Sequence, residues 1–151
     1  MNNSIDRELA GFIYADGCCM IIKQSRKKKY KDKVYSFINY VPRINITQRA
    51  DNLKFLEFVK ERYGGHISPN NSLKNSNPVF YWQVQSFERC LGITEILLDT
   101  KIPYSKLEAV RILNEFCKWR IEIGKGKFKP EELKMIEDWH RRIRLANSYK
   151  E

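Results

Sequence analysis

The chain has 151 residues, of which 28 are Lys or Arg and 18 are Asp or Glu, and it carries a formal net charge of +10 at pH 7. A hydrophobic content of 42% with 13% aromatic residues predicts a folded domain with a core and excludes a disordered chain. The positive charge indicates a polyanionic partner, most often nucleic acid, over the alternative of a basic protein with no such partner.

The first half of the chain predicts a helix, a hairpin and a second helix. In chain order these are a helix that ends near Ala15, strands over residues 18–24 and 34–48, and a helix from Asp51 that stops at Gly64 and Gly65. Ser4 or Asp6 is the candidate N-cap of the first helix. Residues 26–33 hold six basic side chains in eight positions and are expected to form a charged loop between the strands, the second of which is interrupted by Pro42.

The second half predicts another hairpin and then helices. A polar loop from Pro69 to Pro78 separates the two strands. Helices are expected over residues 87–98, from Ser105 to about residue 121, and from Pro130 to about residue 149. The order of elements predicts an α+β domain in which helices back one antiparallel sheet. The pairing between the two hairpins stays open.

The cysteines indicate reduced thiols. They are Cys18, Cys19, Cys90 and Cys117. No Cys-x-x-Cys pair is present and the chain has only 2 histidines, which does not suit a zinc site. We therefore expect a reducing intracellular compartment, the cytoplasm or an organelle matrix. With no secretory signal and no long apolar stretch, we expect neither secretion nor a membrane partner.

The stretch LAGFIYADG, Leu9 to Gly17, ends an apolar helix on a carboxylate. Asp16 would lie at the C-terminus of this helix, where the helix dipole disfavours a negative charge and a divalent cation would compensate it. Gly17 is expected to permit the sharp turn into the next strand. The alternative is an ordinary Asp-Gly turn.

The same helix has a groove of small residues. Gly11 and Ala15 lie four residues apart, so a second helix backbone can approach this face closely. Leu9, Phe12 and Ile13 are expected to face the core of the chain.

This stretch resembles the motif that names the LAGLIDADG homing endonucleases. The segment VPRINITQ, Val41 to Gln48, is similar to the second strand of that family, and the order of elements fits over about residues 5–123. The resemblance implies an αββαββα domain with a saddle-shaped antiparallel sheet, here a single domain over residues 1–151 with a helical extension at about 130–149. It also implies cleavage of double-stranded DNA, at a long pseudo-palindromic target, by metal-dependent hydrolysis.

The resemblance also implies roles for individual residues. Asp16 would hold the catalytic metal, and the carbonyl of Ala15 would be the adjacent backbone ligand. Gln48 would lie near the scissile phosphates and orient water. Lys106, with Lys101 as the alternative, is the candidate for the basic residue of the family's active site. Mg²⁺ suits such oxygen ligands, with Mn²⁺ as a possible substitute.

One complete motif implies two chains. The nearest second copy, LGITEILLD from Leu91 to Asp99, lacks the Asp-Gly end. The paired helices of the family would then come from a homodimer, with Gly11, Tyr14 and Ala15 at the contact. Tyr14 stands where the family often has an acidic residue, and this departure bears on the geometry of the helix pair.

The two hairpins are expected to contact DNA, because a two-stranded ribbon fits a major groove. Alternating residues that would read bases are Met20, Ile22, Gln24, Arg26, Arg43, Asn45, Ser68, Asn70, Tyr81, Gln83 and Gln85. The basic run, with Lys27, Lys28 and Lys29, is expected to grip phosphates, or else to be a solvated loop or a targeting patch. Because Met20 and Ile22 are apolar, their face could instead belong to the core.

Other functions are weaker matches to the sequence. A binding protein on the same fold, such as an intron maturase or a transcription regulator, would keep the surface without cleavage. Glu132 and Lys134 have the spacing of another nuclease motif, but they fall in a predicted helix with no partner acid. An RNA-binding module of the aromatic-platform kind lacks its characteristic stretch. No small-molecule substrate is expected.

Overall fold

The computed structural model describes residues 4–70, 78–100, 106–124 and 128–148. The elements are α1 (Ser4–Asp16), β1 (Gly17–Tyr30), β2 (Lys33–Arg49), a 3₁₀ turn η1 (Ala50–Asn52), α2 (Leu53–Tyr63), β3 (His66–Pro69), β4 (Val79–Val84), α3 (Phe87–Asp99), α4 (Leu107–Ile123) and α5 (Pro130–Ser148). The predicted α+β class and element order are confirmed. Among these residues, no helix is long and apolar enough to cross a membrane.

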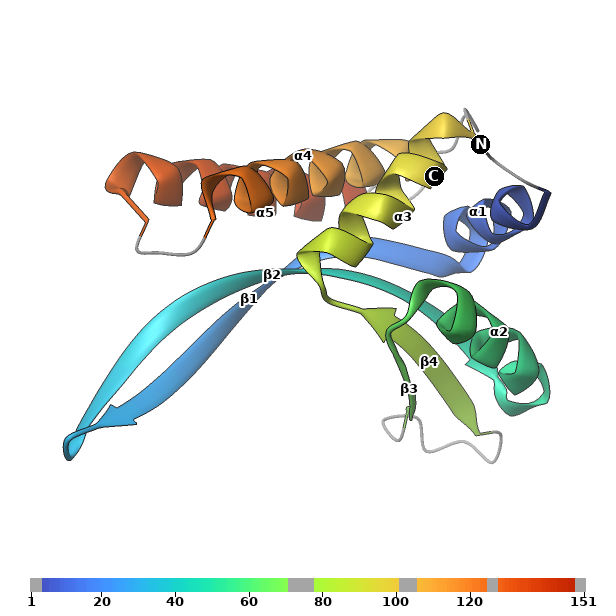
Figure 1. Ribbon diagram of the computed structural model, residues 1–151, viewed down its shortest axis with the longest axis horizontal. Helices are drawn as coiled ribbons and strands as arrows, with labels where there is room; N and C mark the ends of the chain where they lie inside the picture. Colours follow the sequence, from blue (N-terminus) through green and yellow to red (C-terminus); the bar gives the residue numbers. More distant parts are fainter. Residues whose placement is uncertain (1–3, 71–77, 101–105, 125–127, 149–151) are drawn as a thin grey trace.

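The strands form one antiparallel sheet in the order β1-β2-β4-β3. The pairing of β2 with β4 joins the two hairpins, which the sequence left open. Figure 1 shows α3, α4 and α5 on the convex side of the arched β1–β2 ribbon, with α1 at one end of the molecule and the hairpin tip at the other. Between α2 and the hairpin tip, no described helix lies on the concave side of the ribbon, which is the open side of the sheet (Figure 1).

Alternation along the strands separates a core face from this open face. The core side chains of the sheet are Cys19, Ile21, Tyr40, Pro42, Ile44, Ile46, Trp82 and Val84. Apart from Pro42, which is buried beside them, they belong to one hydrophobic cluster with buried residues of the helices, including Ile136 and Ile143 of α5. Asn147 of α5 also donates a hydrogen bond to the carbonyl of Cys19 at 2.9 Å, so the last helix is fixed to the edge strand.

The basic run is strand rather than loop, which corrects the sequence prediction. The β1–β2 pairing continues to Tyr30 and Lys33, and the turn contains only Lys31 and Asp32. Both turn residues have positive φ, at 46° and 64°. Two positive φ angles are characteristic of the tight hairpin turn that matches strand twist. Pro42 does not interrupt β2 either, because β4 pairs only from Ile44 onward and one side of β2 is an edge at the proline.

Two expectations for α1 are also corrected. Asp6 lies inside the helix, which begins at Ser4, and its buried carboxylate accepts hydrogen bonds from Arg62 and Tyr63 of α2. Leu9 and Ile13 are buried as expected, but Phe12 is 39% exposed. Its ring lies beside that of Phe55 of α2, with centroids 4.3 Å apart. The cap expected at Ser105 falls outside the described residues.

Candidate active site and nucleic-acid interface

The carboxylate of Asp16 lies where α1 passes directly into β1. Gly17 packs so tightly at this junction that a Cβ there would lie 2.8 Å from the backbone oxygens of both Asn45 and Ile13. Close approach of helix and sheet therefore requires the glycine. The expected reason, freedom of the turn, is corrected, because Gly17 is not among the positive-φ glycines. The exposed Asp16 side chain is thus held at the junction of α1 and β1.

Gln48, which the resemblance placed near the scissile phosphates, lies beside Asp16. Its Nε2 donates to Asp16 Oδ2 at 3.1 Å, and its Oε1 accepts from Asn52 Nδ2 at 2.8 Å. Gln48 is near the end of β2, and Asn52 ends η1, so strand and turn supply consecutive members of one hydrogen-bonded chain. Sequence reasoning missed Asn52. The sequence feature that could have indicated Asn52 is an amide side chain four residues after Gln48, at the start of the next helix.

Lys106 reaches the same junction from the segment before α4. Its ammonium donates to the carbonyl of Gly17 at 2.7 Å and to that of Ala15 at 3.3 Å. The lysine thus neutralises carbonyl oxygens at the negative end of α1. The alternative candidate, Lys101, lies outside the described residues. The ammonium also faces Cys18, where burial raises the pKa of the thiol and the charge of Lys106 partly opposes that shift.

The oxygens at the end of α1 are hard donors. The carboxylate of Asp16 and the carbonyl of Ala15 are the ligand types that Mg²⁺ prefers. Within the described part of a single chain, no three His, Cys, Asp or Glu side chains lie close enough together to hold a metal ion. All four cysteines are free thiols.

The interface candidates of α1 do not share one face. Gly11 and Ala15 are accessible, and a Cβ on Gly11 would meet no atom within 4 Å. Tyr14 is only 2% exposed, and its hydroxyl donates to the carbonyl of Leu97 at 3.0 Å. Burial raises the pKa of Tyr14 to about 12. Tyr14 therefore belongs to the core of its own chain and holds α1 against α3, which corrects its assignment to the helix–helix contact.

The strand register places most of the expected DNA-contacting residues on the open face. Paired residues there are Cys18 with Asn45, Met20 with Arg43, Ile22 with Val41, Gln24 with Asn39, Arg26 with Phe37, Asn45 with Gln83 and Ser68 with Tyr81. Met20 and Ile22 are half-buried on this face, whereas Cys19 and Ile21 fill the core. The sequence had left open which of these two sets of alternating residues faces the core. Asn70 follows β3, and its N–H donates to the carbonyl of Val79.

Hydrogen bonds order several polar side chains on this face. Arg26 donates to Gln24 Oε1 at 3.0 Å. With its amide oxygen turned toward Arg43, Gln85 accepts from the guanidinium Nε at 2.9 Å. His66 lies opposite Gln83, with 3.1 Å between its Nε2 and the amide nitrogen. Sequence reasoning missed His66, although its alternation with Ser68 would have placed it on this face.

The basic run divides between the two faces of the β1–β2 hairpin beyond Gln24, which we call the arm. Arg26 and Lys28 pair with Phe37 and Tyr35 and share the open face, whereas Lys27 and Lys29 project from the opposite one. Consecutive basic residues of the run thus face opposite sides of the arm.

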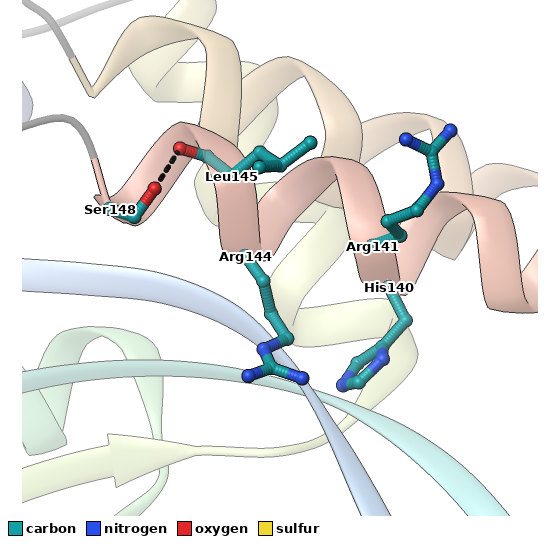
Figure 2. A pocket seen from close by; sticks show the side chains of 5 residues that line it. All are labelled: His140, Arg141, Arg144, Leu145 and Ser148. Atoms are coloured by element: carbon teal, nitrogen blue, oxygen red, sulfur yellow. Dashed lines mark hydrogen bonds between the residues drawn. The ribbon is translucent and has the colours of Figure 1, made fainter.

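A separate basic cavity lies on α5. It has a volume of about 310 Å³ and is lined by His140, Arg141, Arg144, Leu145 and Ser148. Figure 2 shows Arg144 and His140 pointing toward the strands, whereas Arg141 points away. Burial and the charges of Arg144 and Lys23 lower the pKa of His140. None of its lining residues belongs to the site at Asp16.

The arched sheet and the carboxylate at the helix–strand junction together define a class of α+β domains, which the comparison with known families identifies. Residues 9–119 match the family model described as LAGLIDADG endonuclease, so the chain belongs to that family. No curated protein matches the chain significantly.

Solved structures of homing endonucleases share the fold. I-CvuI in complex with its target is 18% identical, with a TM-score of 0.72 over 99% of this chain and 88% of that chain. I-SmaMI bound to uncleavable DNA is 25% identical, with a TM-score of 0.65 over 92% of this chain and 45% of that one. I-GzeII in complex with its DNA target is 18% identical, with a TM-score of 0.66 over 89% and 43%. The chain thus spans less than half the length of I-SmaMI and I-GzeII.

Proposed function

We propose that this chain is one subunit of a homodimeric, metal-dependent endonuclease that cuts double-stranded DNA at a specific site. The observation that carries the proposal is the convergence of Asp16, Gln48 and Lys106 at the junction of α1 and β1. Similar structures, those of I-SmaMI and I-GzeII among them, are complexes with DNA, which supports DNA as the partner.

We infer a dimer because one chain offers one copy of the candidate site. A single copy supplies one exposed carboxylate at the site, whereas cleavage of two strands needs two sites. Gly11, Phe12 and Ala15 form an accessible face of α1, and pairing two copies of this face would bring both Asp16 residues near one axis.

The donor set fits a hard cation. Asp16 and the carbonyl of Ala15 would hold Mg²⁺, with Mn²⁺ as a substitute. When bound, the cation would supply positive charge to the phosphate and lower the pKa of a nearby water. Gln48 holds the Asp16 carboxylate in place through its amide. Lys106 places a fixed positive charge beside the junction, where it would stabilise an anionic phosphate.

Specificity would come from the open face. Arg43, Asn45 and Gln83 are side chains of the types that recognise guanine and adenine in the major groove. Because a twofold dimer presents this face twice, the target would be long and pseudo-palindromic.

The test compares wild type with Asp16→Asn. We expect the variant to fold and to bind target DNA in chelator, but to lose Mg²⁺-dependent cleavage of both strands, because Asn keeps the size of Asp but not its charge. Asp51→Asn, an exposed carboxylate in η1, is the matched control and should cut normally. Full cleavage by Asp16→Asn would overturn the assignment. A wild type that binds without nicking would instead favour a maturase or transcription regulator.

A further inference from the structure

Asn52 is linked to Asp16 through Gln48. Its Nδ2 lies 2.8 Å from Gln48 Oε1, and Gln48 Nε2 lies 3.1 Å from Asp16 Oδ2. An amide has one end that accepts hydrogen bonds and one that donates them, while a carboxylate only accepts. Asp16 therefore favours the orientation of the Gln48 amide with the nitrogen toward it, and Asn52 donates to the oxygen at the other end.

The backbone that carries Asn52 is fixed on the second hairpin. The N–H of Ala50, at the start of η1, donates to the carbonyl of Pro78 at 3.0 Å. Gln48 is itself held in the sheet, where it pairs with Phe80 of β4. Asn52 and Gln48 thus come from two anchored elements, so their hydrogen bond can hold a side-chain orientation that neither would maintain alone.

The orientation matters because Gln48 has two ways to act near a cation. With its oxygen turned toward Asp16, it could offer an additional oxygen ligand. With its nitrogen turned there, it donates to the carboxylate and keeps a second N–H for a water or a phosphate oxygen. With Asn52 oriented as observed, turning the Gln48 amide over would bring two NH₂ groups face to face, so both amides would have to turn together.

We propose that Asn52 is a positioning residue that keeps Gln48 as a hydrogen-bond donor to Asp16. The role rests on the proposed function, in which Asp16 is the catalytic candidate. Asn52 acts only through Gln48, so its removal has no effect on the site once the amide of Gln48 is gone. It lies on an exposed turn, and its side chain contributes little to the core.

A double-mutant cycle tests this dependence. Cleavage is measured under single-turnover conditions at saturating protein for wild type, Asn52→Ala, Gln48→Ala and the double variant. We expect Asn52→Ala to cut about five- to tenfold more slowly, the loss expected for one hydrogen bond, with unchanged DNA affinity in chelator. In the Gln48→Ala background the same substitution should have no further effect. An equal loss in both backgrounds, or none in wild type, would overturn the proposal.

Asn52→Asp gives the sharper contrast. The new carboxylate only accepts, so it would draw Gln48 Nε2 away from Asp16, and cleavage should be slower than in Asn52→Ala. Asp51→Ala, in the same turn, is the control and should cut like wild type.

A second readout does not depend on cleavage. The ¹⁵N–¹H signals of the Gln48 side chain are recorded in metal-free protein for the same variants. We expect Asn52→Ala and Asn52→Asp to shift these signals, and Asp51→Ala to leave them in place. Unchanged signals in both Asn52 variants would refute the positioning role even if wild type cleaves DNA. If wild type does not cleave, the proposed function fails while this spectrum still decides the role of Asn52.

Discussion

At the scale of single residues, the position of the candidate site depends on how closely α1 approaches the sheet. Gly17 marks the closest approach, with backbone oxygens on two sides of its missing side chain. Asp16 precedes it directly, so any movement that relieves a contact at Gly17 displaces the carboxylate. The geometry of the site and the packing of the core are therefore set by the same residue.

Gly17→Ala should destabilise the chain by about 1–3 kcal/mol, because the contacts at 2.8 Å are with backbone atoms that cannot rotate away. Cleavage should fall as well, since Asp16 moves. Denaturant unfolding measures the first effect. Gly92→Ala is the control, because Gly92 lies in α3 with nothing within 4 Å of an added Cβ, and it should stabilise by up to about 1 kcal/mol. Equal stability of Gly17→Ala and wild type would contradict the packing argument.

At the scale of elements, a buried ionic contact fixes the orientation of α1 against α2. Asp6 is 8% exposed, and its carboxylate accepts from Arg62 at 2.9 Å and from the hydroxyl of Tyr63. The hydrogen bond from Arg62 lowers the pKa of Asp6 below its ordinary value of 3.8, although burial opposes the shift. The folded chain thus stabilises the ionised form.

This contact predicts a pH dependence of stability. Because the pKa of Asp6 is lowered on folding, its contribution is present above the ordinary value and is lost as pH falls through the lowered one. Asp6→Asn should be less stable than wild type at pH 7, by about 2 kcal/mol for a charged hydrogen bond. Unfolding measured from pH 7 down to about pH 2.5 should show the two proteins converging in acid. A constant difference across this range would exclude the carboxylate as the cause.

The β1–β2 arm gives a prediction that distinguishes neighbouring cations. Arg26 and Lys28 share the open face, and Lys27 and Lys29 the other. Replacing the first pair with Gln should lower the slope of log affinity against log salt concentration by about two for each subunit, and so by about four for the dimer, because each subunit loses two phosphate contacts. Replacing the second pair removes the same charge but should change the slope less. The measurement is DNA binding in chelator at several salt concentrations, and equal slopes for the two variants would argue against the open face as the interface.

The sequence predicted the residues of the candidate site better than it predicted the conformation of the arm. Asp16 and Gln48 belong to local patterns, so their roles could be inferred before their 3.1 Å contact was known. The arm was misread because positive-φ turns usually contain Gly or Asn, whereas this one contains Lys31 and Asp32. Asn52 and the burial of Tyr14 depend on contacts between elements, which periodicity within one element does not report.

At the scale of the whole molecule, α1 is exposed where a second subunit would complete the site. Figure 1 places this helix at one end and the arm at the other. Two chains joined through α1 would therefore extend their arms in opposite directions from a shared centre. In such a dimer, cleavage would take place near the twofold axis and DNA recognition would take place along the two sheets.

Gly11→Leu tests this arrangement. Gly11 and Gly92 are both helical glycines with no atom within 4 Å of an added Cβ, so the first atom of a side chain has room at either position in the single chain. If two copies of α1 pack together, leucine at position 11 alone would separate them, and dimer and cleavage should be lost together while the fold remains. Gly92→Leu should keep both. Sedimentation at matched concentrations measures the association, and a wild type that is monomeric both free and on DNA would exclude the dimer. A Gly11→Leu variant that stays dimeric yet cannot cut would instead mean that the subunits join elsewhere, because leucine on α1 would then affect the site without affecting the interface.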